Sequence, residues 1–256
     1  MKYKKSQMKI GIFGDSNADC YHGGTPDHQH LSWPNLLEKR FSVSNYALAG
    51  SGLEYSLDNL FRHEHEYDKI IFISTVPDRL AINERHHHKL ARPHHIDAEL
   101  HQHIRPANIE GRPGDRYYNK ALKLAQRHHD TFVDYEHLNL RVALIWKSLY
   151  DYFGDRLLLL HTHRPTDNYM EKFNLPQDNM NLFNISHYEN TYLFGNETPS
   201  WQYDKRSCHI THWHHAILFD KIIKWISTGF FSLTENDLVK LDKQEVKDMY
   251  YGKYKI

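Results

Sequence analysis

Residues 8–16 read MKIGIFGDS, a short apolar run that ends in glycine, aspartate and serine. Comparable apolar runs, each bounded by polar residues, occur at Phe41–Ala47, Lys69–Ser74, Arg156–His161 and, more weakly, Asn181–Ile185. Runs of this length between turn residues are typical of buried strands. The sequence therefore predicts about five strands, of which Met8–Phe13 is the first.

Between these runs lie longer stretches in which apolar residues recur at helical spacing. They are Leu31–Arg40, Leu53–His65, Arg116–His129 and Leu138–Phe153, followed by a stretch that runs from Trp213 to Ile226. Strands that alternate with helices favour a parallel sheet with helices on both faces. We therefore expect an α/β protein, a three-layer αβα sandwich.

The length of 256 residues is ordinary for one α/β domain, so we expect residues 1–256 to form a single domain. The segment 83–115 interrupts the alternation, because it is rich in histidine, proline and glycine and poor in apolar residues. Such an insertion is a functional lid or a plain surface excursion. Ser232 and Glu235 match a capping box and predict a C-terminal helical extension at about 232–256.

Charge and composition exclude several classes of protein. Lysine plus arginine equals aspartate plus glutamate at 32 each, so no overall field attracts nucleic acid or an anionic membrane. No apolar stretch approaches the ~20 residues that cross a bilayer, and the N-terminus has too short an apolar core for a signal peptide. We expect a cytoplasmic protein with no nucleic-acid or membrane partner, in which Cys20 and Cys208 are reduced thiols.

The 22 histidines raise the question of a metal site. No HExxH or CxxC motif is present, and adjacent histidines cannot easily face one ion together. Solvated or hydrogen-bonded histidines are therefore favoured over a zinc site. We expect neither a metal nor another cofactor.

Parallel α/β sheets bind ligands beyond the carboxyl ends of their strands. Ser16 stands just past the first expected strand, where its hydroxyl group and nearby backbone N–H groups can meet at the sheet edge. This arrangement suits a nucleophile with an oxyanion hole. The alternative is a tight turn in which Asp15 or Ser16 only caps the residues that follow.

A serine nucleophile needs a base, and histidine is best suited because its pKa lies near the working pH. His209 directly precedes the last amphipathic stretch, and Asp204 lies close enough in sequence to orient its ring. The alternative is that His209 only satisfies a hydrogen bond of its loop.

Three motifs, taken in order, resemble the SGNH (GDSL-like) hydrolase superfamily. They are Gly14-Asp15-Ser16, the run from Asn45 to Gly50, and Asp204 followed by His209-Ile210-Thr211. The resemblance spans residues 10 to 215 and implies the flavodoxin-like form of the three-layer sandwich. Ser32-Trp33-Pro34, Asn45-Tyr46-Ala47 and residues 75–79 also look like divergent members encoded by tailed bacteriophages.

The resemblance implies a role for each matching residue. Ser16 would be the nucleophile, and its backbone N–H one donor of the oxyanion hole. The N–H of Gly50 would be a second donor, His209 the base, and Asp204 the carboxylate that orients the base.

The sequence departs from the family pattern in two places. Thr75-Val76-Pro77-Asp78 stands where the family has G-x-N-D, so the asparagine of the oxyanion hole is missing, and Arg79 or Asn83 is the candidate substitute. Arg206 stands three residues before His209, where the family has aspartate. Asp204 is two residues further away, so either the loop bulges or a backbone carbonyl accepts the hydrogen bond from the base.

The resemblance implies a serine ester hydrolase, a carboxylesterase or deacetylase, with O-acetylated glycans as a substrate class. Two alternatives stay open. Without the asparagine, the chain would be a slow or inactive SGNH-like binding protein. If a sugar hydroxyl group rather than water resolves the acyl-enzyme, it would be an O-acyltransferase.

Overall fold

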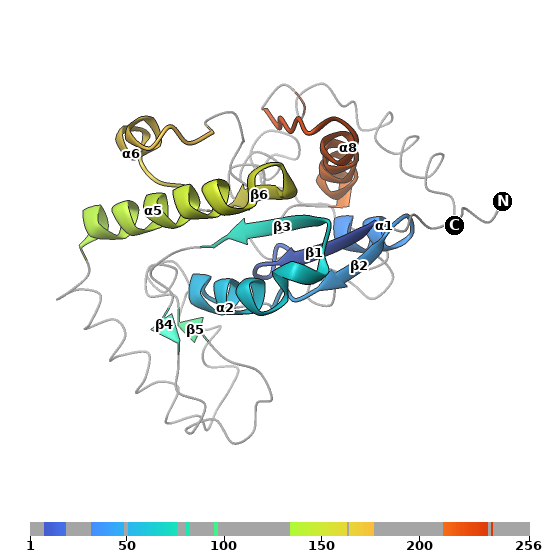
Figure 1. The fold of residues 1–256 in the computed structure, drawn as a ribbon, viewed down its shortest axis with the longest axis horizontal. Helices are drawn as coiled ribbons and strands as arrows, with labels where there is room; N and C mark the ends of the chain where they lie inside the picture. Colours follow the sequence, from blue (N-terminus) through green and yellow to red (C-terminus); the bar gives the residue numbers. More distant parts are fainter. Residues whose placement is uncertain are drawn as a thin grey trace, which may run out of the picture.

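The computed structural model describes residues 8–18, 32–48, 51–75, 80–81, 95–96, 134–162, 164–176, 212–234 and 237. Its main sheet has four parallel strands in the order β2-β1-β3-β6 (Figure 1). The strands are β1 (Lys9–Phe13), β2 (Ser42–Asn45), β3 (Lys69–Ser74) and β6 (Leu157–His161). The four strands predicted from the stronger apolar runs are thus confirmed. The expected strand Asn181–Ile185 lies outside the described residues.

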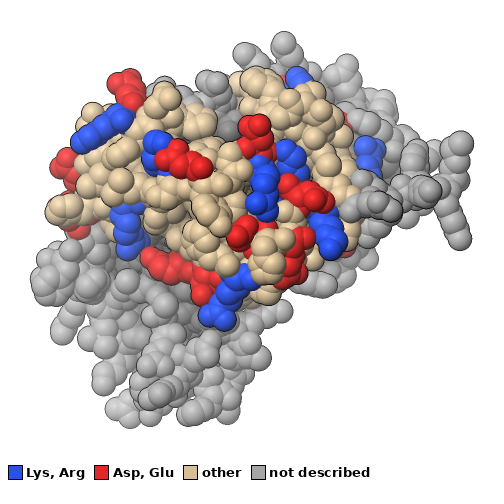
Figure 2. Space-filling model, in the orientation of Figure 1, with Lys and Arg blue, Asp and Glu red and all other residues tan. Residues whose placement is uncertain are grey.

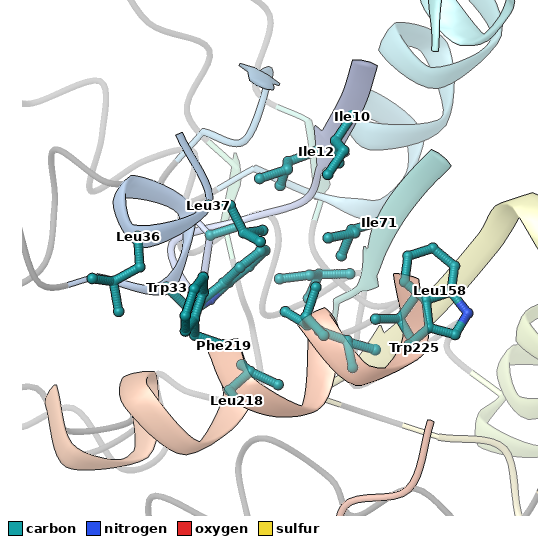
Figure 3. Close-up of a cluster of buried hydrophobic side chains, with 14 of the residues drawn as sticks. Ile10, Ile12, Trp33, Leu36, Leu37, Ile71, Leu158, Leu218, Phe219 and Trp225 are labelled. Atoms are coloured by element: carbon teal, nitrogen blue, oxygen red, sulfur yellow. The ribbon is translucent and has the colours of Figure 1, made fainter. Parts of the chain in front are cut away.

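One face of the sheet is covered by α1 (Trp33–Glu38) and α8 (His212–Thr228). Alternate residues of β1, β3 and β6 point to this face because side chains along a strand alternate between its two sides. Figure 3 shows these strand side chains packed against those of the two helices. The buried cluster includes Ile10, Ile12, Trp33, Leu36, Leu37, Ile71, Leu158, Leu218, Phe219 and Trp225.

The opposite face is covered by α2 (Leu53–His63) and α5 (Tyr135–Phe153), and α6 (Asp167–Lys172) packs beside α5. The remaining strand residues, among them Phe13, Phe72 and Leu159, lie in the second buried cluster together with Leu53 of α2 and Trp146 of α5. Helices on both faces of a parallel sheet confirm the expected α/β sandwich.

The helix boundaries follow from local chemistry. Asp134 caps α5, because its side chain accepts hydrogen bonds from the backbone N–H groups of Glu136 and His137. The helix ends at Gly154, whose φ of 52° suits glycine. Proline at the second position of α1 is tolerated because the first-turn N–H groups have no partner within the helix. A short 3₁₀ turn follows each of α2 and α5, at Glu64–Glu66 (η2) and Gly154–Arg156 (η5).

Some elements differ from the expectation. Helix α6 was not expected, because its six residues are too few to show periodicity. The two-residue strands β4 (Leu80–Ala81) and β5 (His95–Ile96) pair antiparallel, and β5 lies within the insertion 83–115. The expected helix Arg116–His129 lies outside the described residues.

Thr234 and Asp237 bond to each other near the position where the sequence predicts a capping box at Ser232 and Glu235; residues 238–256 of the expected extension lie outside the described residues. The carboxylate of Asp237 accepts hydrogen bonds from the backbone N–H and the hydroxyl group of Thr234. Asp237 also pairs with Lys221 of α8. The capping contacts are thus made by Thr234 and Asp237, whereas Glu235 of the expected pair lies outside the described residues.

Replacing Gly14 by alanine is expected to destabilise the fold. A Cβ atom at this position would lie 2.7 Å from Cβ of Ile73, so β1 and β3 would have to separate. Overpacking of this kind costs about 1–3 kcal/mol of the free energy of unfolding. Denaturant unfolding of G14A beside the wild type measures the loss, and equal midpoints would contradict this reading of the strand contact.

The visible surface carries both signs of charge. Lysine and arginine side chains lie among aspartate and glutamate side chains over the described residues of this face (Figure 2). Among the helices that the structure describes, none has the length and apolar character to span a bilayer.

Candidate functional site

The topology of the sheet predicts a ligand site at the carboxyl ends of β1 and β3. After β1 the chain passes through α1, on one face of the sheet, to β2 on one side; after β3 it passes through α5, on the other face, to β6 on the opposite side. β1 and β3 are neighbours, so the connections diverge between them. In open α/β sheets this point of divergence is where ligands bind.

Ser16 lies at this point, in a turn that begins two residues after β1 ends. The turn is closed by Asp15, whose backbone oxygen accepts the N–H of Ala18 at 3.0 Å. The Asp15 carboxylate also accepts the N–H of Asn17 at 3.0 Å. The side chain of Asp15 therefore caps the turn. Ser16 itself is only half-buried.

The Asp15 carboxylate also joins the ends of the two central strands. Its Oδ1 atom accepts a second hydrogen bond, from Nδ2 of Asn17 at 3.1 Å, and its Oδ2 atom accepts the hydroxyl group of Thr75 at 2.8 Å. Asp15 and Thr75 are fully buried. Hydrogen bonds made away from water are stronger than exposed ones, so the turn is firmly held.

The end of β2 and the loop after it also lie against the turn of residues 15–18, which we call the serine turn. Nδ2 of Asn45 donates to the backbone oxygen of Ala18 at 2.7 Å. The backbone oxygen of Gly14 accepts the N–H of Leu48 at 3.1 Å and the hydroxyl group of Ser51 at 3.1 Å. Both sides of the segment that contains Gly50 are thus bonded to the end of β1.

Trp33 connects the serine turn to α8. Its indole Nε1–H donates to the backbone oxygen of Asn17 at 3.0 Å. Its backbone N–H donates to Nδ1 of His215, in the first turn of α8, at 3.4 Å. The start of α8 therefore lies close to the start of α1, which in turn contacts the serine turn.

The other site residues expected from the sequence lie outside the described residues. These are Gly50, Arg79, Asn83, Asp204 and His209. Cys20 and Cys208 lie outside them too. In the part of the chain that the structure describes, no three histidine, cysteine, aspartate or glutamate side chains are grouped so as to hold a metal ion.

Tyr46, just past β2, does not supply an alternative base. Burial raises the pKa of its phenol, and the hydrogen bond of 2.8 Å with the hydroxyl group of Tyr67 raises it further. The ring of Tyr46 is stacked between Phe13 and His63, with centroid distances of 5.1 and 4.5 Å. Tyr46 is thus a neutral packing residue at working pH.

A second polar cluster at the sheet edge belongs to the core. The indole N–H of Trp146 donates to the hydroxyl group of Ser74 at 2.9 Å, and its ring lies 5.1 Å from that of His161. All three side chains are buried. Ser74 and Thr75 are consecutive residues, yet Ser74 bonds to α5 while Thr75 bonds to the serine turn.

No motif in the sequence indicates what Thr75, Asn45 and Trp33 do at the site. Thr75 stands where the family pattern has glycine. The one feature of the sequence that points to a role for Thr75 is its position directly after a buried strand, because parallel sheets bind ligands at the carboxyl ends of their strands.

Comparison with known proteins gives structural matches only. No family model and no curated protein matches the chain. Esterase EstA from Pseudoalteromonas sp. matches with a TM-score of 0.42 and 12% identity over 87% of this chain and 100% of its own. A lipase/acylhydrolase from Enterococcus faecalis gives 0.43 and 13% over 89% and 100%. LAE5, an alpha/beta hydrolase enzyme from the metagenome of Lake Arreo, Spain, gives 0.41 and 11% over 90% and 100%.

Proposed function

We propose that the chain is a serine ester hydrolase of the SGNH kind, acting on acyl esters, with O-acetylated glycans as the substrate class. The observation that carries the proposal is the position of Ser16 at the point where the chain connections diverge. It stands on a turn that a buried carboxylate closes and that hydrogen bonds join to both neighbouring strand ends.

In the proposed reaction, the hydroxyl oxygen of Ser16 attacks the ester carbonyl carbon while His209 takes the hydroxyl proton. The backbone N–H groups of Ser16 and Gly50 stabilise the oxyanion, and Arg79 or Asn83 supplies a side-chain donor in place of the missing asparagine. The alcohol leaves with the proton from His209. Water, activated by His209, then hydrolyses the acyl-enzyme and releases the acid.

The contacts of α8 support His209 as the base. His209 precedes the first residue of α8 by three residues, a span of at most roughly 11 Å for an extended chain. The first turn of α8 bonds to Trp33, and Trp33 bonds to the residue after Ser16. The start of α8, three residues after His209, therefore lies on the side of the molecule that carries the serine turn. Asp204 is proposed as the acceptor that orients His209.

The loop contacts support the second oxyanion donor. Leu48 and Ser51, on either side of Gly50, both bond to the backbone oxygen of Gly14, two residues before Ser16. Leu48 and Ser51 are thereby bonded to the end of β1. We propose that the N–H of Gly50, between them in the chain, is the second donor to the developing oxyanion.

Covalent trapping tests the proposal. A fluorophosphonate is expected to phosphonylate Ser16, because the serine oxygen bonds to phosphorus as fluoride leaves and His209 accepts the proton. Peptide mass spectrometry should find one adduct, on the peptide that contains Ser16. H209A should label at least about 100-fold more slowly. Ser148, an exposed serine of α5, should stay unmodified and serves as the internal control.

Release of p-nitrophenol from its acetate ester completes the test. Labelling together with release in water supports the hydrolase. Neither labelling nor release above the rate of buffer would contradict the proposal and favour a binding protein. Release that appears only with an added sugar hydroxyl acceptor would identify an O-acyltransferase instead.

A further inference from the structure

The end of β3 makes a contact with the serine turn that neither the motif match nor the proposed reaction includes. Thr75 directly follows β3 and is fully buried. Its hydroxyl group lies 2.8 Å from Oδ2 of Asp15, which is 60 residues earlier in the chain. The threonine hydroxyl group is the donor, and the carboxylate oxygen is the acceptor.

The two oxygens of the Asp15 carboxylate have different partners. Oδ1 accepts the backbone N–H and the side-chain amide of Asn17, at 3.0 and 3.1 Å. Oδ2 accepts the hydroxyl group of Thr75. Rotation of the carboxylate would break both sets of bonds together. In the chain, Ser16 lies between Asp15, which carries the carboxylate, and Asn17, which donates two hydrogen bonds to it.

We propose that Thr75 is a positioning residue for Ser16: its hydroxyl group fixes the Asp15 carboxylate, and the carboxylate fixes the turn on which Ser16 attacks. The inference rests on the proposed function for its catalytic consequence. Its structural part, the dependence of the turn on Thr75, does not. A displacement of about 1 Å in a nucleophile is enough to slow a reaction roughly 100-fold.

Asn17 adds a second reason to expect a rigid turn. Its side-chain amide is oriented by the bond from Nδ2 to Asp15, and Asn17 is only 7% exposed. Both the backbone and the side chain of Asn17 are therefore bonded to the Asp15 carboxylate.

Two substitutions at position 75 and one at position 74 form a matched set. T75V keeps the shape of the side chain and removes the donor, whereas T75S keeps the donor and removes a methyl group. S74A removes the neighbouring buried hydroxyl group, whose bond is to Trp146 rather than to Asp15. All three variants change a buried side chain at the same strand end, so they separate positioning from a general effect on packing.

The first measurement is hydrogen exchange of the Asn17 backbone amide, which does not depend on any ester substrate. T75V should accelerate this exchange at least about tenfold relative to the global unfolding rate measured on the same sample. T75S and S74A should leave it within about twofold of the wild type. Unchanged exchange in T75V would overturn the inference, whatever the protein does to esters.

The second measurement is hydrolysis of p-nitrophenyl acetate. T75V should lower kcat roughly 10- to 100-fold with little change in KM, T75S should restore most of kcat, and S74A should keep it. Equal losses of kcat in T75V and S74A would overturn the positioning role. If the wild type itself releases no nitrophenol, the proposed function fails, and the exchange of Asn17 alone then decides whether Thr75 positions the turn.

Discussion

Replacing Ser16 by alanine is expected to abolish ester turnover while leaving the protein folded. The substitution removes the only atom proposed to bond covalently to the acyl group, and loss of such a nucleophile costs at least about 1,000-fold in kcat. The turn itself should persist. The bonds that close it come from the Asp15 carboxylate and from backbone atoms of Asp15 and Ala18, which the substitution does not touch.

Steady-state hydrolysis of p-nitrophenyl acetate measures the first effect, and thermal unfolding measures the second. We expect the melting temperature of S16A to lie within about 4 °C of that of the wild type, which corresponds to about 1 kcal/mol for a protein of this size. H209A should show the same kinetic loss, because nucleophile and base act as one unit. Turnover by S16A at more than a tenth of the wild-type rate would contradict the role of Ser16.

Trp33→Ala is expected to have a large effect on stability. Trp33 is fully buried in the cluster between α1, α8 and the sheet, next to Phe219 and Leu37 (Figure 3). Truncation of a buried tryptophan costs about 3–5 kcal/mol. The variant also loses the indole bond to Asn17, so the turn that carries Ser16 loses its connection to α8.

Trp225→Ala is the matched control, because Trp225 lies in the same cluster and is also buried, near the end of α8. Both variants should lower the free energy of unfolding by similar amounts in urea. Only W33A should reduce kcat in the folded protein, by roughly tenfold or more. Equal kcat values in the two variants would show that Trp33 contributes packing alone. Trp33→Phe, which keeps most of the packing and removes the donor, should fall between W33A and the wild type.

The framework of the fold could be predicted from the sequence because three of its four strands, β1, β3 and β6, are almost entirely apolar. For example, β3 ends at Ser74, the first polar residue after the apolar run of residues 70–73. Parallel strands buried on both faces give this signal directly. The elements β4, β5 and α6 give no such signal in the sequence. β4 and β5 have two residues each and α6 has six, which is too few for an apolar pattern to repeat.

The site could be predicted only in part, for a related reason. Ser16 was found because its motif is local, three consecutive residues after a strand. The bond between Asp15 and Thr75 joins residues 60 apart, and the contact between Trp33 and His215 joins residues 182 apart. Such pairs depend on strand order and helix docking, which periodicity does not encode. The predicted roles of Gly50, Arg79, Asn83, Asp204 and His209 stay predictions.

The docking of α8 on α1 has a consequence for how the molecule acquires its shape. The helix 212–228 supplies much of the apolar cover for β1, β3 and β6, although those strands belong to the first 161 residues. Contacts so distant along the chain carry a large loop-closure entropy and form slowly. During synthesis, the isoleucine-rich side of the sheet stays exposed to water until α8 emerges from the ribosome. A fragment that stops before residue 212 would expose that side and tend to aggregate.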